Sequence, residues 1–137
     1  MEYIIGVSLA LAVSVLARVI GFDRDRAFYP TMTIVIASFY GLFAVAGGTR
    51  DVLAVESVMI VGFVVIAALG FRFNLWLLVA ALFAHGIFDF FHGHVISNPG
   101  VPLWWPMFCL TYDITAAGCL ASLLGRSKIA MKPSKSD

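Results

Sequence analysis

Long apolar runs separated by short polar connectors dominate the pattern of this 137-residue chain. A helix needs about 20 mostly apolar residues to cross the hydrocarbon core of a bilayer. Five runs reach this length, at residues 2–21, 28–46, 52–71, 73–94 and 103–124. The pattern therefore predicts an all-α fold, a polytopic membrane helix bundle with five transmembrane helices.

The connectors between these runs contain residues that end helices. Residues 22–27 alternate in charge, Gly47 and Gly48 end the second run, and residues 95–102 (VISNPGVP) form the one sizeable loop. Little chain is left outside the five runs. We therefore expect a single five-span transmembrane domain over residues 1–125, followed by a basic cytoplasmic tail over residues 126–137.

Composition points to the same class of protein. The chain is 61% hydrophobic and 12% charged, with a mean hydropathy of +0.97, whereas soluble domains average about 45–50% apolar and about 25% charged residues. Glu2 stands where a secretory signal would carry Lys or Arg, so we expect the first run to be retained. The expected surroundings are a lipid bilayer, namely a prokaryotic cytoplasmic (inner) membrane, and no nucleic-acid partner is expected.

Basic residues are divided unevenly between the two ends of the predicted bundle. With five spans, Arg50 stands alone at one end. The other end holds eight: Arg18, Arg24, Arg26, Arg72, Arg126, Lys128, Lys132 and Lys135. Because Lys and Arg are enriched on the cytoplasmic side of membrane proteins, we expect the N-terminus outside and the C-terminus in the cytoplasm.

One polar stretch, AHGIFDFFHGH at residues 84–94, interrupts the apolar pattern of the fourth run. His85, Asp89 and His92 are spaced i, i+4 and i+7, so they share one face of a helix. His94 falls about 180° from His85 around an ideal helix, which favours an interfacial role. Ionisable side chains at membrane depth are costly and mark functional sites. This face is therefore the candidate site.

Two further acids fall at the same depth on neighbouring runs. At about 1.5 Å of rise per residue, Glu56 lies level with Asp89, and Asp113 lies level with His85. All of these groups fall in the outer half of the bilayer. The inner halves of the third and fourth runs carry neither carboxylate nor imidazole. The pattern predicts a pocket open to the outside and closed below, which disfavours a through-going ion route.

Imidazoles and carboxylates together suit zinc, iron or manganese. We expect His85, Asp89 and His92 to bind a divalent metal, zinc or iron, and we assign catalytic roles to Glu56 and Asp113. A metal-bound water, with its pKa lowered toward about 7, would then hydrolyse a lipid-like substrate.

The alternative is a non-enzymatic membrane protein, either a small transporter or a complex subunit. In that case Asp89 pairs with one of the histidines, and Glu56 and Asp113 are protonated and hydrogen-bonded between helices. The polar cluster is then a structural core. In either case five short helices enclose little volume, so a homo-oligomer could complete the pocket.

An Asp with several His residues in a small membrane bundle resembles the arrangement in membrane zinc hydrolases of the alkaline ceramidase type. The matching residues are His85, Asp89 and His92, and the resemblance covers one helix. It implies zinc-dependent hydrolysis. Those proteins have seven spans and a serine that is not placed in this chain.

Overall fold

The computed structural model describes residues 1–126 and 129, and in this part of the chain it contains five long α-helices and one short 3-10 helix. Their bounds are α1 Glu2–Ile20, η1 Phe22–Arg24, α2 Phe28–Gly47, α3 Arg50–Arg72, α4 Trp76–Val95 and α5 Trp105–Gly125. Each long helix is long and apolar enough to span a membrane. The predicted all-α bundle of five such helices is confirmed. Most of the predicted tail, residues 127–128 and 130–137, lies outside the described residues.

Local hydrogen bonds set the helix ends. Gly21 closes α1 in the left-handed conformation, with φ of 92°, which a residue without a Cβ adopts readily. The Thr49 hydroxyl accepts a hydrogen bond from the Val52 N–H and caps α3. The Asn74 side chain accepts one from the Trp76 N–H at 3.0 Å. This turn explains why α4 begins at Trp76 rather than at residue 73.

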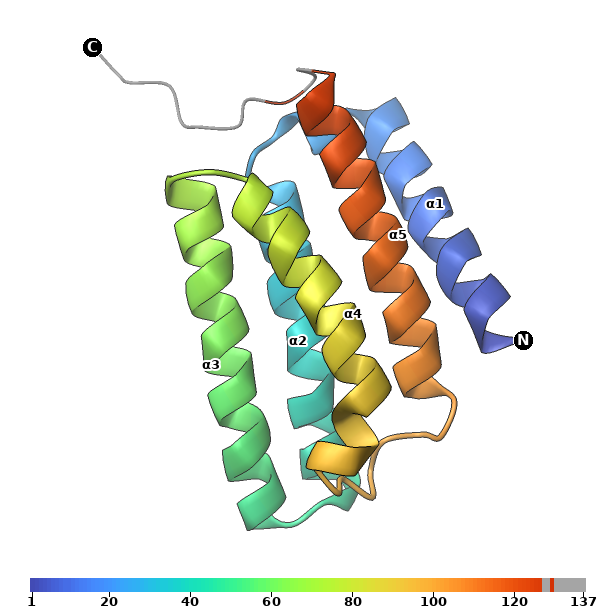
Figure 1. Ribbon diagram of the computed structural model, residues 1–137, viewed down its shortest axis with the longest axis vertical. Helices are drawn as coiled ribbons and strands as arrows, with labels where there is room; N and C mark the ends of the chain where they lie inside the picture. Colours follow the sequence, from blue (N-terminus) through green and yellow to red (C-terminus); the bar gives the residue numbers. More distant parts are fainter. Residues whose placement is uncertain (127–128, 130–137) are drawn as a thin grey trace.

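The helices form an up-and-down bundle with α1 at one edge and α3 at the other (Figure 1). The chain packs α1 along α5, α5 along α4, and α2 along α3, while α4 also contacts α2 and α3. The connector 48–49 and the loop 96–104 share one end, which we name the loop end. The η1 end is the opposite one, with η1, the connector 73–75 and Arg126.

The surface of the bundle is more apolar than that of a soluble protein, and its interior contains several ionisable side chains beside the apolar ones. Large apolar side chains are exposed along the long helices, among them Ile4, Val15, Leu42, Val58 and Phe90. The buried polar residues are Asp23, Thr33, Glu56, His85, Asp89, His92, Asn98 and Asp113. Extensive exposed apolar surface marks contact with lipid or with another apolar partner, and ionisable groups within membrane spans face the bundle interior. This distribution is typical of a helix bundle in lipid.

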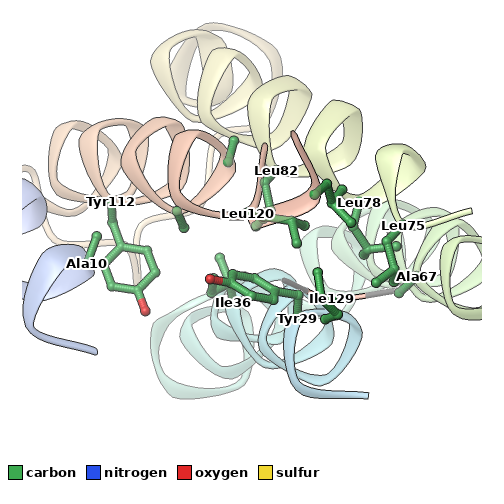
Figure 2. Packing of buried hydrophobic residues seen from close by; sticks show 13 residues of the cluster. Ala10, Tyr29, Ile36, Ala67, Leu75, Leu78, Leu82, Tyr112, Leu120 and Ile129 are labelled. Atoms are coloured by element: carbon green, nitrogen blue, oxygen red, sulfur yellow. The ribbon is translucent and has the colours of Figure 1, made fainter. Parts of the chain in front are cut away.

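A hydrophobic cluster fills the half of the bundle nearest the η1 end. Figure 2 shows Leu75, which directly precedes α4, and Leu78 and Leu82 of α4 near Leu120 of α5 and Tyr29 of α2. The leucines of this group are at most 1% exposed. The inner half that the sequence predicted to be closed is therefore packed with apolar side chains.

Close backbone contact holds α1 against α5. A Cβ at Gly6 would collide with the Thr111 hydroxyl and with the Phe108 carbonyl oxygen, so glycine permits the approach. The two cysteines, Cys109 and Cys119, are free thiols in the described structure. Their ten-residue separation along α5 is too long for a disulfide between them.

Candidate metal centre

The five residues predicted from depth are all buried in the half of the bundle nearest the loop end. They are Glu56 on α3, His85, Asp89 and His92 on α4, and Asp113 on α5. Antiparallel packing of these helices brings residues from different runs to one level. The structure divides them into two hydrogen-bonded groups.

The first group, which we name the His85 group, comprises His85, Asp89 and Asp113. The Nδ1 atom of His85 lies 2.7 Å from Oδ2 of Asp113 and 3.3 Å from Oδ2 of Asp89. One ligand atom from each residue lies within 4.8 Å of the others. His85 and Asp89 meet because they are one helical turn apart, and Asp113 meets them because α5 packs along α4. The contact confirms that Asp113 lies level with His85.

The two carboxylates of the His85 group share a single basic partner and are only partly compensated. Three of their oxygens, both of Asp89 and Oδ1 of Asp113, have no hydrogen-bond partner among the described residues. Both side chains are 0% exposed. Within the described part, the basic group at ion-pair distance from both carboxylates is His85. Buried carboxylates without compensation are strongly unfavourable. Two acids that share one imidazole, with three oxygens that accept no hydrogen bond from the described residues, therefore fit a bound cation.

The second group, the Glu56 group, comprises Glu56, His92 and Asn98. Oε1 of Glu56 lies 2.8 Å from Nε2 of His92 and accepts a hydrogen bond from the Asn98 amide at 2.9 Å. The Asn98 amide also donates to the Tyr40 carbonyl at 3.2 Å, and its oxygen accepts from the Gly100 N–H. The Glu56 group thus fastens the loop 96–104 to α2, α3 and α4.

Glycine is required where this loop rests on α2. A Cβ at Gly100 would collide with the Phe43 carbonyl oxygen and approach the backbone of Gly47. The close approach places Asn98 within reach of the Tyr40 carbonyl. The loop is therefore a fixed wall of the site.

Aromatic rings hold both imidazoles. Tyr40 stacks on His92 with ring centroids 4.0 Å apart and an interplanar angle of 23°. Phe63 meets His85 edge-on at 4.6 Å. The Tyr40 hydroxyl lies near the Asp89 carboxylate without a well-aligned hydrogen bond to any described residue. Tyr40 therefore connects the two groups.

A cavity of about 330 Å³ reaches both groups from the loop end. It lies between the end of α4, the loop and the start of α5, and Asp89 and His92 both line it. Apolar side chains such as Ile96, Leu103 and Met107 form much of the rest. A volume of this size is typical of a small-molecule site. The cavity therefore borders one residue of each group, Asp89 and His92, whereas His85, Asp113 and Glu56 do not line it.

The predicted metal ligands are thus separated. His85 and Asp89 lie with Asp113, which the sequence assigned a catalytic role, while His92 lies with Glu56. The shared helical face was read correctly, but residue 92 is about 10 Å beyond residue 85 along the axis. Each histidine therefore meets a different neighbouring acid.

Sequence reasoning missed Tyr40 and Asn98. Tyr40 lies in an apolar run, but the depth count that found Glu56 could have found it on α2. Asn98 carries no such signal, because its position depends on how the loop folds back onto α2.

Comparison with known proteins found no family model, no curated protein and no solved structure that matches the chain. The resemblance to alkaline-ceramidase-type zinc hydrolases is carried by His85, Asp89 and His92 alone, and His92 lies outside the His85 group.

Proposed function

We propose that this chain is an integral membrane protein with a divalent metal site formed by His85, Asp89 and Asp113. The observation that carries the proposal is the set of three buried carboxylate oxygens that lack hydrogen-bond partners among the described residues, next to a single imidazole. A divalent cation would compensate both carboxylates. One nitrogen and two oxygen ligands suit zinc or iron.

The proposed reaction is metal-dependent hydrolysis of a lipid-like substrate. When bound, the metal supplies positive charge and lowers the pKa of a coordinated water toward about 7. The imidazole of His92 lines the same cavity as Asp89 and can accept a proton there. Glu56 holds Nε2 of His92, so it acts through the histidine as a positioning residue. Asp113 serves as a ligand in this proposal.

The apolar lining of the cavity supports a lipophilic substrate. Leu103 at its mouth is fully exposed, and the surrounding helix faces are apolar. A substrate could therefore enter from the lipid side of the loop end. From the positive-inside bias we expect this end to face the outside of the cell. We propose a prokaryotic cytoplasmic membrane as its location. A reporter enzyme fused to the C-terminus should be active in the cytoplasm, and activity confined to the outside would contradict this orientation.

The second candidate is a structural core in a non-enzymatic protein, a small transporter or a complex subunit. It is favoured by the pairing of each imidazole with an acid on another helix, His85 with Asp113 and His92 with Glu56. Such pairs hold membrane helices together without any ligand.

Metal analysis of the purified full-length protein separates the two candidates. After equilibrium dialysis against zinc or iron(II), the proposal expects about one equivalent of metal per chain, and Asp89→Asn or Asp113→Asn should lose it. His94→Ala is the matched control, because His94 is an exposed histidine on the same helix. A folded protein that takes up no metal would contradict the metal site and favour the second candidate, a structural polar core.

Hydrolysis is tested separately with a fluorescent ceramide and a fluorescent ester-linked phospholipid in vesicles. Release of product should require the metal and should fall in Glu56→Gln, while metal content stays unchanged. A metal-loaded protein that cleaves neither lipid would contradict hydrolysis of these two lipid classes and leave the metal site intact.

A further inference from the structure

A second cavity lies at the η1 end, between α1 and α5, at the opposite end of the bundle from the metal centre. Its volume is about 410 Å³. Leu11, Val15 and Val19 line it from α1, and Gly118 and Leu123 line it from α5. Arg18 and Arg126 line its end, where α1 and α5 finish. The cavity thus combines apolar walls with a basic end.

A buried acid also lines this cavity. Asp23 of η1 is 2% exposed, and its Oδ2 accepts a hydrogen bond from Arg18 at 3.0 Å. Among residues 1–126 and 129, its Oδ1 has no hydrogen-bond partner. The hydroxyl of Tyr29, which is 3% exposed, lies near the Ser14 side chain without a well-aligned hydrogen bond. Asp23 lines the cavity, and a buried carboxylate oxygen without a hydrogen-bond donor is energetically unfavourable. The cavity therefore presents an unsatisfied acceptor beside two guanidinium groups.

The charges of the cavity suit a ligand with both signs. The two positive charges of Arg18 and Arg126 exceed the negative charge of Asp23 by one. Arginine binds phosphate through paired N–H donors. The side chain of Arg18 is 43% exposed despite its bond to Asp23, so its guanidinium remains accessible. The free Oδ1 of Asp23 would pair with a cation such as a primary ammonium.

The apolar walls indicate that this ligand carries a hydrocarbon chain. Val15 and Val19 are 62% and 78% exposed, and they continue from the basic end toward the middle of the bundle. Basic residues at the ends of membrane spans commonly meet lipid headgroups. A free phosphate would leave these walls uncovered.

We propose that the cavity between α1 and α5 binds one molecule of a zwitterionic aminophospholipid, phosphatidylethanolamine. Its phosphate lies on Arg18 and Arg126, its ammonium donates to Oδ1 of Asp23, and one acyl chain lies in the groove between the two helices. The site is independent of the metal centre, and its test does not involve hydrolysis.

The test is native mass spectrometry of the full-length protein, purified in detergent and mixed with defined lipids. Phosphatidylethanolamine should bind as one retained molecule, about tenfold more tightly than phosphatidylcholine, since the quaternary ammonium cannot donate a hydrogen bond. N-methylated and N,N-dimethylated phosphatidylethanolamine should fall between the two. Phosphatidylglycerol lacks the ammonium and should bind more weakly than phosphatidylethanolamine.

Substitutions of the charged residues test which side chain contacts which part of the lipid headgroup. Asp23→Asn should reduce the preference for phosphatidylethanolamine over phosphatidylcholine, because an amide oxygen is a weaker acceptor than a carboxylate. Arg126→Gln should weaken the binding of both lipids. Arg24→Gln is the matched control, because Arg24 is exposed in η1 and does not line the cavity. If Asp23→Asn fails to fold, the methylated lipid series on the wild type still tests the contact of the ammonium, and Arg126→Gln still tests the contact of the phosphate.

Three results would overturn the proposal. One is equal retention of phosphatidylethanolamine and phosphatidylcholine, which indicates unspecific annular lipid. Another is saturable binding of phosphoethanolamine without acyl chains at the same affinity, which indicates a soluble ligand. The third is tighter binding of phosphatidylglycerol, which indicates a site for anionic lipid.

Discussion

The two halves of this bundle are built from the same helices but held together differently. Near the η1 end, α3, α4 and α5 meet through side chains such as Ala67, Leu78 and Leu120. Near the loop end, the same helices meet through His85 with Asp113 and His92 with Glu56. Apolar packing needs only shape complementarity, whereas buried polar pairs require partners with matched geometry.

This difference shows why the site is a closed pocket. On α4 the ionisable side chains end where the leucines begin, one turn below His85 at Leu82 and then at Leu78. An ion or proton would have no ligand in the leucine layer. The apolar half therefore serves as a floor, and the polar half opens through the cavity at the loop end.

The largest expected effect comes from breaking the apolar half. Leu78 is 0% exposed and packs in the core between helices, so Leu78→Ala should lower the free energy of unfolding by about 3 kcal/mol. The measurement is reversible unfolding in mixed detergent micelles. The neighbouring Leu77 is 42% exposed, and Leu77→Ala should change stability by less than about 0.5 kcal/mol. Equal losses in both variants would contradict the packing described here.

The next effect concerns the polar half alone. Asp89→Asn keeps the shape of the side chain but removes a charged ligand, so zinc affinity should fall about 100-fold, or about 2.8 kcal/mol. Metal titration with a competing chromophoric chelator measures this change. Asp51→Asn, an exposed acid in the first turn of α3, is the control. Unchanged affinity in Asp89→Asn would exclude that carboxylate as a ligand.

Removing the metal should have a smaller effect on stability. At a free zinc concentration ten times the dissociation constant, bound metal stabilises the folded state by about 1.4 kcal/mol. A chelator should remove this increment from the wild type and from Leu78→Ala alike, because the two halves are separate. An increment that vanishes in Leu78→Ala would show that the apolar floor determines the metal site.

The smallest effect is expected at the loop. Asn98→Ala removes the amide that bridges Glu56 and the Tyr40 carbonyl, at a cost of about 1 kcal/mol. Hydrogen exchange of residues 96–101 should accelerate in this variant. Ser97→Ala, at an exposed neighbour, should leave exchange unchanged. Equal exchange in both variants would show that Asn98 does not hold the loop.

The sequence predicted the helices because their apolar runs match the thickness of a bilayer. It also predicted the level of Asp113, since a constant rise per residue converts position into depth. It could not predict that His92 pairs with Glu56 and lies outside the His85 group. Helical periodicity fixes a shared face, but which acid a side chain meets depends on how α3 and α5 pack against α4. The role of Asn98 could not be predicted either, because contacts with α2 set the path of its loop.

X-ray absorption spectroscopy of the zinc-loaded, full-length protein tests the central claim most directly. The account predicts one equivalent of zinc with one imidazole nitrogen and carboxylate oxygens at about 2.0–2.2 Å. The imidazole contribution should be lost in His85→Ala and kept in His92→Ala and His94→Ala. A spectrum that loses its imidazole in His92→Ala, or a wild-type protein that holds no zinc, would contradict the assignment of His85, Asp89 and Asp113 as the metal centre.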